Sequence, residues 1–223
     1  IHHDCQNPDL FTECGITMRG TPIRLRSDIL KATFVVSMGP ICHHYFAGYG
    51  GGRKLIFPGC GEREAIYANH GLYLNREKAQ LEVNCQPGIL ENNPLAEDLF
   101  EIAAQKEADL AIHGIMNSHG VMCDVIVGPG KSSYLKACRQ HGDLCESISR
   151  SFPAIVASCG GFPKDINFIQ SHKAIHNAAM FVDDGGMLLI FSECRDGLGS
   201  KTFLPWFKSG GFDKAFNRLS INY

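Results

Sequence analysis

The sequence lacks any apolar run long enough to cross a membrane. A spanning helix needs about 18 or more consecutive apolar residues, and no stretch of this chain of 223 residues approaches that length. The amino terminus also lacks a basic segment followed by a hydrophobic core, which is the pattern of a signal peptide. We therefore expect a cytoplasmic protein without a membrane anchor.

An excess of charge of one sign is missing as well. The chain has 21 basic and 23 acidic side chains, which gives a formal net charge of −2. Proteins that bind polyanions usually carry a basic excess, so the composition argues against nucleic acid and anionic membranes as partners. Hydrophobic residues at 44% and charged residues at 20% are typical of a globular protein with a buried core.

The ten cysteines form neither a C-x-x-C pair nor a dense framework. Disulfide scaffolds belong mainly to small secreted domains, and zinc sites need ligands at characteristic spacing. We interpret most of these cysteines as small buried apolar residues. A structural zinc site is the weaker interpretation of the histidines described below.

Short β-branched runs alternate with helical patterns along the chain. This alternation predicts an α/β fold of two α/β units, with mostly parallel, Rossmann-like sheets and the site at the interface between the units. We place the later part of a cofactor-binding catalytic domain at residues 1–148 and a second α/β domain at residues 149–223. The predicted strands are 22–25, 32–38, 108–115, 121–127, 154–158 and 187–191, and the predicted helices are 62–74, 93–105, 132–141 and 167–181.

A glycine run lies at the centre of the chemically richest stretch, residues 42–70. Glycines leave room for backbone N–H groups to approach a phosphate closely, so Gly50, Gly51 and Gly52 are candidate phosphate contacts. Lys54 follows them and precedes an apolar run. Such a lysine is either a partly desolvated nucleophile or a solvated phosphate contact.

Histidines bracket this turn. His43 and His44 precede the glycines, and His70 lies on the helix predicted after them. Imidazole transfers protons near neutral pH and binds metals such as zinc or nickel. The grouping therefore predicts a site that works by proton transfer or by metal binding.

Two nucleotide-binding motifs fail in this sequence. The dinucleotide pattern G-x-G-x-x-G starting at Gly48 requires a glycine where Arg53 stands. The phosphate-loop pattern around GPGKSS requires a glycine where Val125 stands.

The stretch HHYFAGYGGGRKLIFPG, followed by EAIYANHG, resembles the nickel-pincer lactate racemase family. Nine residues separate His44 from Lys54, and fifteen separate Lys54 from His70, as in the family pattern. The similarity begins at RGTPIRL and continues into GGFPKDINFIQSHKA, so it covers most of the chain.

The resemblance implies a racemase or epimerase of a 2-hydroxy acid such as lactate. It implies a nickel-pincer nucleotide, a pyridinium mononucleotide whose sulfur arms hold Ni, attached to Lys54 and made by cofactor-synthesis enzymes. His70 would bind the nickel, and His44 would act as acid and base while hydride moves to the cofactor and back. Gln170 and Lys173, one helical turn apart, would hold the substrate. The resemblance leaves open whether the protein is a homo-oligomer.

The sequence also departs from the family pattern. The family's other acid/base histidine lies in an H-R-P-x-T segment that is absent here, so we expect residues outside this chain to complete catalysis. Gly50 stands where relatives have serine. His43, next to His44, is an alternative acid/base residue.

Two other interpretations remain. The first is a non-catalytic α/β module that binds metal and phosphate without a covalent cofactor, and it predicts metal retention that His70→Ala abolishes. The second is a plain α/β domain in which the histidines and cysteines are core residues.

Overall fold

The structure, a computed structural model, describes residues 2–117, 119–145, 150–200 and 203–222. The chain divides into two compact units, Ile1–Glu146 (unit 1) and Ser147–Asn222 (unit 2). The predicted domain boundary between residues 148 and 149 lies outside the described residues.

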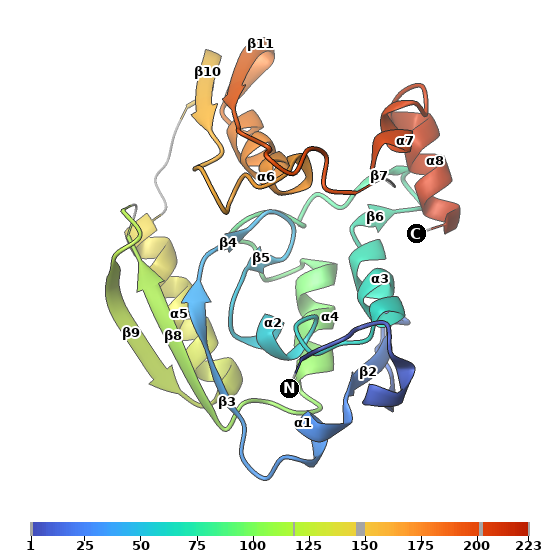
Figure 1. The fold of residues 1–223 in the computed structure, drawn as a ribbon, viewed down its shortest axis with the longest axis vertical. Coiled ribbons are helices and arrows are strands. Elements are labelled where there is room, and N and C mark those ends of the chain that lie inside the picture. Colours follow the sequence, from blue (N-terminus) through green and yellow to red (C-terminus); the bar gives the residue numbers. More distant parts are fainter. Residues whose placement is uncertain (1, 118, 146–149, 201–202, 223) are drawn as a thin grey trace. The chain divides into compact units, whose positions relative to one another are not determined.

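Unit 1 contains a three-stranded sheet with strand order β3-β8-β9. Helix α5 runs along one face of this sheet, as Figure 1 shows. Strands β3 and β8 are parallel, whereas β8 and β9 form an antiparallel hairpin. The long segment between β3 and β8 carries the helices that hold the candidate site. These elements are β3 (Val36–Ile41), α2 (Arg53–Ile56), α3 (Arg63–Gly71), α4 (Pro94–Ala103), β8 (Leu110–Met116), β9 (Met122–Gly128) and α5 (Gly130–Cys145).

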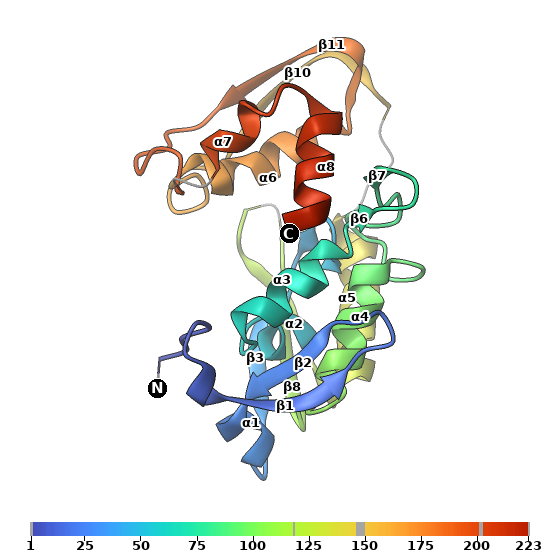
Figure 2. The same cartoon turned by 90° about the vertical axis from the view of Figure 1, so that its right-hand side faces the viewer.

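Short hairpins complete unit 1. The turn of the β1–β2 hairpin lies beside α4 (Figure 2). There Arg19 binds Glu97 at 2.6 Å, and the Met18 N–H binds Glu101 at 2.9 Å. The remaining elements of the unit are a 3-10 helix (Pro8–Leu10), β1 (Phe11–Ile16), β2 (Pro22–Arg26), α1 (Ser27–Lys31), β4 (His43–His44), β5 (Gly48–Tyr49), β6 (Leu74–Asn75) and β7 (Gln80–Leu81).

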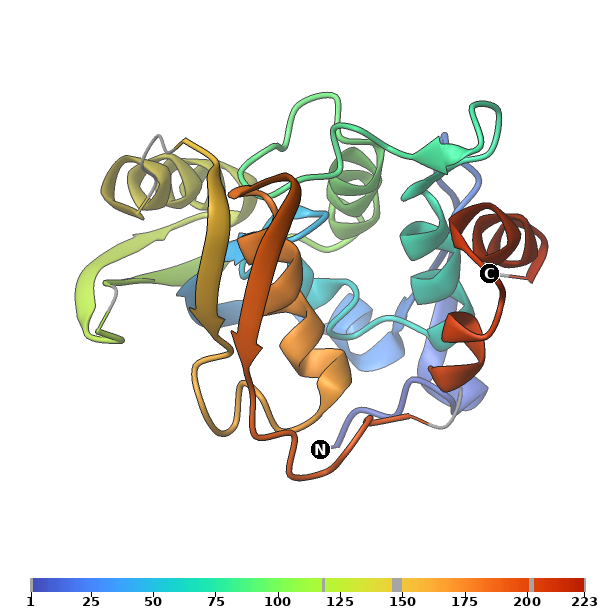
Figure 3. The same cartoon turned by 90° about the horizontal axis from the view of Figure 1, so that it is seen from above.

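Unit 2 is built on a parallel strand pair. Strands β10 and β11 run side by side in the same direction (Figure 3), and α6 connects them and packs against both. A crossover helix is the usual way to join parallel neighbours. The elements are β10 (Phe152–Ser158), α6 (Phe168–Ala179), β11 (Val182–Phe191), α7 (Leu204–Phe207) and α8 (Phe212–Asn222).

The predicted α/β class is confirmed, but a mostly parallel, Rossmann-like arrangement is not. Only β3–β8 and β10–β11 are parallel, whereas β1–β2, β4–β5, β6–β7 and β8–β9 are antiparallel in the described part of the chain. Each antiparallel pair is joined by a short turn, and a parallel pair needs a crossover of about a dozen residues or more.

Two smaller predictions are corrected by the structure. Strand β3 does not stop before Gly39-Pro40 but continues to Ile41. It is an edge strand, where the missing N–H of a proline is tolerated. The cysteines are mostly not buried: only Cys85, Cys138 and Cys159 are, and all ten are free thiols. None of the helices in the described residues has the length and apolar character needed to span a membrane.

Two apolar clusters form the core of unit 1, and the turn after His44 joins them. Phe46 and Ala47 belong to the cluster that includes α4, whereas Tyr49 belongs to the cluster beneath α5. The segment between His44 and the glycine run is therefore buried on both sides.

Candidate active site

The adjacent histidines of β4 have different neighbours. His43 pairs with Tyr49 across the hairpin and stacks on its ring, with the centroids 5.1 Å apart, and it also lies 4.8 Å from His141. His44 instead meets the edge of Phe46 at 4.7 Å. Successive residues of a strand project to opposite sides, which explains why the two imidazoles separate.

Phe46 is the residue on which the candidate side chains of unit 1 converge. Its ring is 5% exposed, and it meets His44 at 4.7 Å and His70 at 5.1 Å in edge-to-face geometry. The Lys54 Nζ lies 5.8 Å from the centre of the same ring. The structure therefore brings His44, Lys54 and His70 together around one buried aromatic side chain.

His70 presents one ring nitrogen as a potential ligand. It lies in the last turn of α3, which Glu62 caps by accepting the Ala65 N–H at 3.1 Å. The His70 Nδ1–H donates to the Ile66 carbonyl at 2.7 Å, which leaves the lone pair on Nε2. Burial, with a smaller contribution from the charge of Lys54, lowers the pKa of His70 to about 4. The imidazole is therefore neutral near pH 7, as metal binding requires.

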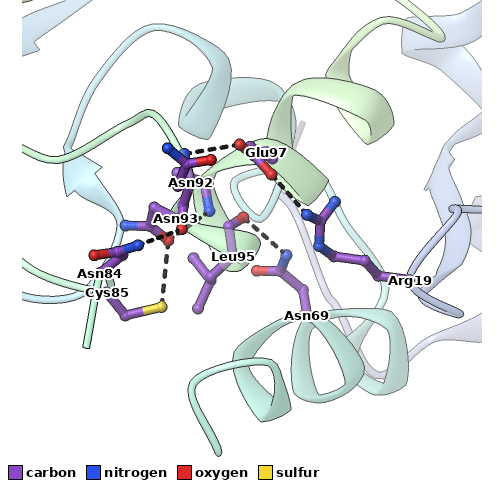
Figure 4. Close-up of polar contacts among 9 residues, drawn as sticks. Arg19, Asn69, Asn84, Cys85, Asn92, Asn93, Leu95 and Glu97 are labelled. Carbon is purple, nitrogen blue, oxygen red and sulfur yellow. Dashed lines mark hydrogen bonds and ion pairs between the residues drawn. The ribbon is translucent and has the colours of Figure 1, made fainter. Parts of the chain in front are cut away.

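The residue before His70 anchors α3 to α4. Asn69 is fully buried, and its Nδ2 donates to Asp98 at 2.8 Å and to the Leu95 carbonyl at 3.4 Å; the contact with Leu95 is visible in Figure 4. A hydrogen-bonded polar group in the core resists displacement, because moving it leaves buried atoms unpaired. These bonds fix the position of α3 and therefore that of His70.

The glycine run turns the chain beneath Lys54. Gly52 has φ +51°, and a Cβ there would collide with the ring of Tyr134, so only glycine fits. The Gly50 N–H donates to the Cys42 carbonyl at 2.7 Å. That hydrogen bond occupies the N–H that we expected to contact a phosphate. Gly51 accepts the Lys54 N–H at 3.0 Å and so belongs to the start of α2.

Arg53 fills the interior next to Lys54. Its side chain is 6% exposed, and burial lowers the pKa of the guanidinium. The guanidinium lies 4.3 Å from the centre of the Phe100 ring and 4.9 Å from that of Tyr134. Stacking on aromatic faces partly replaces the water that the cation loses.

The two candidate residues of unit 2 are neighbours. Asn167 caps α6 by accepting the Gln170 N–H at 3.0 Å, and the Lys173 Nζ donates to Gln170 Oε1 at 2.7 Å. Both side chains are exposed. Their roles toward a substrate, and a site at the interface of the units, stay predictions.

Sequence reasoning missed the residues that support the site. Phe46, Arg53 and Tyr134 carry no catalytic motif, although Arg53 adjoins Lys54 and Tyr134 directly follows the GPGKSS stretch. Among the residues that the structure describes, no three His, Cys, Asp or Glu side chains gather closely enough to hold a metal ion by themselves.

Family models match both units of the chain. Residues 1–82 match the lactate racemase N-terminal domain, and residues 150–219 match the lactate racemase C-terminal domain. The lactate racemase of Thermoanaerobacterium thermosaccharolyticum is 31% identical over 211 residues, which are 93% of this chain and 48% of that protein. The lactate racemase of Lactiplantibacillus plantarum is 28% identical over 198 residues, or 86% of this chain and 44% of that protein.

Solved structures agree with these matches. The lactate racemase apoprotein of T. thermosaccharolyticum superposes with a TM-score of 0.84 at 27% identity, over 99% of this chain and 57% of that one. A crystal structure of a protein from Thermotoga maritima shares the fold, with a TM-score of 0.63 at 14% identity, over 99% of this chain and 61% of that one. The chain spans about half the length of the curated relatives that it matches. On these matches, the chain belongs to the lactate racemase family.

Proposed function

We propose that this chain provides the cofactor-binding part of a racemase that acts on lactate or a similar 2-hydroxy acid. The observation that carries the proposal is the convergence of His44, Lys54 and His70 around Phe46. These are the residues that match the family motif. The relatives are lactate racemases, and the chain spans about half their length, so the activity itself is proposed for this chain.

The residues present fit a lysine-linked nickel cofactor. Lys54 and His70 face the same aromatic ring, and the charge of Lys54 is close enough to contribute to the lowered pKa of His70. His70 is neutral, and its Nδ1–H is held by a backbone carbonyl. A histidine that binds metal usually donates its other N–H in this way. In the proposal Lys54 holds the organic group and His70 contributes one nickel ligand.

His44 is proposed as the group that handles the proton of the substrate hydroxyl. The carbon-bound hydrogen next to a carboxylate is barely acidic, so racemisation by proton abstraction alone is difficult. When bound, the cofactor supplies a hydride acceptor and donor, which avoids a carbanion. His44 would meet the substrate oxygen through Nε2, because its Nδ1 accepts the Ala47 N–H at 3.2 Å.

Gln170 and Lys173 are proposed to bind the substrate. The Lys173 ammonium would offset the carboxylate charge, and the Gln170 amide would orient the carboxylate or the hydroxyl oxygen. Their mutual hydrogen bond at 2.7 Å supports a shared role, since it aligns both polar ends on one side of α6.

The proposal is tested by following the conversion of one lactate enantiomer into the other. The complete protein that contains this chain is co-produced with cofactor-synthesis enzymes, and Lys54→Ala is compared with Lys78→Ala, which alters an exposed lysine. We expect racemisation in the wild type and in Lys78→Ala and none in Lys54→Ala. Unchanged racemisation in Lys54→Ala would refute the proposed role of the lysine.

The non-catalytic metal-binding alternative makes a different prediction. It requires nickel or zinc to be retained stoichiometrically by the protein made without cofactor, and to be lost in His70→Ala. The covalent proposal requires cofactor for tight nickel retention.

A further inference from the structure

The turn between His44 and the glycine run is held at four successive carbonyl oxygens. Asn93 Nδ2 donates to the Phe46 carbonyl at 2.9 Å, and Arg53 Nη2 donates to the Ala47 carbonyl at 3.1 Å. The Gly88 N–H binds the Gly48 carbonyl at 2.9 Å, and the Tyr134 hydroxyl donates to the Tyr49 carbonyl at 3.1 Å. We call residues 46–49 the clamped turn.

The donors of the clamped turn are themselves fixed in the core. Asn93 is fully buried and uses its whole amide: Nδ2 also donates to the Ile89 carbonyl at 3.0 Å, while Oδ1 accepts the Ala96 N–H at 3.0 Å and the Cys85 thiol at 3.3 Å. The position of this residue at the start of α4 is visible in Figure 4. An asparagine with both donors and its oxygen satisfied has little freedom to move.

Arg53 and Tyr134 form the second fixed group. Arg53 Nη1 donates to the Tyr134 hydroxyl, whose own proton goes to Tyr49, so the two side chains share one network. Tyr134 is 1% exposed and Arg53 is 6% exposed. Displacing the turn would leave several buried polar groups without partners at once, and each such loss is unfavourable.

The Ala47 amide of the clamped turn sets the orientation of His44. His44 Nδ1 accepts the Ala47 N–H at 3.2 Å. A nitrogen that accepts an N–H cannot carry a proton itself, so the neutral ring must be protonated at Nε2. The position of the Ala47 amide therefore decides both where the ring lies and which nitrogen carries its proton.

We propose that Asn93, Arg53 and Tyr134 are positioning residues for His44, which act by holding the clamped turn so that His44 is presented with its proton on Nε2. This inference rests on the proposed function, and it assigns to the neutral His44 a hydrogen bond from its Nε2–H to the substrate oxygen. None of the three side chains needs to touch substrate or cofactor.

The test determines directly which ring nitrogen of His44 carries the proton. Long-range ¹H–¹⁵N spectra of the histidine-labelled protein, recorded where the imidazoles are neutral, distinguish the two tautomers, and His44→Gln assigns the signals. We expect the Nε2–H form in the wild type. Tyr134→Phe removes one hydroxyl and keeps the ring, while Asn93→Asp keeps the oxygen that caps α4 and removes both amide donors.

Matched variants control for local and global effects. Asn84→Asp alters an amide that binds the Asn92 carbonyl at 3.1 Å, near Asn93 but away from the clamped turn, and Tyr67→Phe alters an exposed tyrosine. We expect Tyr134→Phe and Asn93→Asp to give a mixture of His44 tautomers, and both controls to keep the wild-type form.

The kinetic readout uses the complete protein that contains this chain, loaded with cofactor. We expect Tyr134→Phe to lower kcat about tenfold, or about 1.4 kcal/mol, with little change in KM. If Tyr134→Phe folds and keeps both the tautomer and kcat, the inference is wrong. If the wild type does not racemise any hydroxy acid but the tautomer shifts as expected, the proposed function fails while the positioning of His44 stands. If Asn93→Asp does not fold, Tyr134→Phe alone decides.

Discussion

Phe46→Ala should destabilise unit 1 strongly, because the phenyl ring is the contact shared by the candidate site residues. The ring is 5% exposed, and truncating a buried phenylalanine to alanine typically costs about 3–5 kcal/mol. Edge-to-face contacts with His44 and His70 add about 0.5–1.5 kcal/mol each beyond area burial. We therefore expect a loss near the upper end, about 4–5 kcal/mol of unfolding free energy.

Phe46→Leu separates volume from ring contacts. Leucine fills most of the space but cannot offer an aromatic edge or face, so we expect a smaller loss of about 1–2 kcal/mol. Phe34→Ala serves as the control because Phe34 is 62% exposed. Its removal should change the unfolding free energy by no more than about 0.5 kcal/mol.

The assay exploits the distribution of aromatic residues. The one tryptophan, Trp206, lies in unit 2, whereas Tyr45, Tyr49, Tyr67, Tyr73 and Tyr134 lie in unit 1. Urea unfolding followed by the tyrosine signal in near-ultraviolet circular dichroism therefore reports on unit 1, and Trp206 fluorescence reports on unit 2. A loss in Phe46→Ala of less than about 2 kcal/mol would contradict the packing argument.

Three further predictions concern separate features. Gly52→Ala should destabilise more than Gly20→Ala, as measured by urea unfolding, because both have positive φ but only Gly52 faces the Tyr134 ring; equal losses would contradict this. Iodoacetamide at about pH 8 should label exposed Cys42 well before Cys85, because burial raises the pKa of the Cys85 thiol to about 11. The reactive thiolate of Cys85 accumulates only as the pH rises toward that value. Peptide mapping measures the order of labelling, and early labelling of Cys85 would refute the prediction. Lys173→Ala should raise KM for lactate about tenfold or more, as measured by initial rates, if its ammonium binds the carboxylate; an unchanged KM would remove that role.

Local patterns predicted the helices and strands that have a periodic or β-branched signal. They did not predict the short elements β1, β4–β7, α1, α2 and α7, or the helix α8 near the end of the chain. The strand predicted at residues 22–25 is β2, and Asn93-Pro94 does start α4, with the asparagine side chain accepting the Ala96 N–H as a cap. Which strands pair, and whether they run parallel or antiparallel, was harder to predict. The direction of strands β4–β7 depends on turns and tertiary contacts that two-residue strands do not reveal in sequence.

The candidate proton-transfer, cofactor-binding and metal-binding residues of the site could be proposed from the sequence. The residues that pack against them and position them could not. His44, Lys54 and His70 stand out by residue type and spacing, whereas Phe46 looks like any core phenylalanine. Its structural role depends on its contacts with His44, His70 and Lys54, which exist only in the folded chain. Tyr134 is a similar case, since its hydroxyl reaches Tyr49 across 85 positions of sequence.

The proposal that Lys54 carries a covalent cofactor is tested most directly by mass. The protein is co-produced with cofactor-synthesis enzymes, its intact mass is measured under denaturing conditions, and its peptides are mapped beside those of Lys54→Ala. We predict an adduct on the peptide that contains Lys54 and no adduct in the variant. An unmodified Lys54 peptide from cells shown to make the cofactor would contradict the proposal.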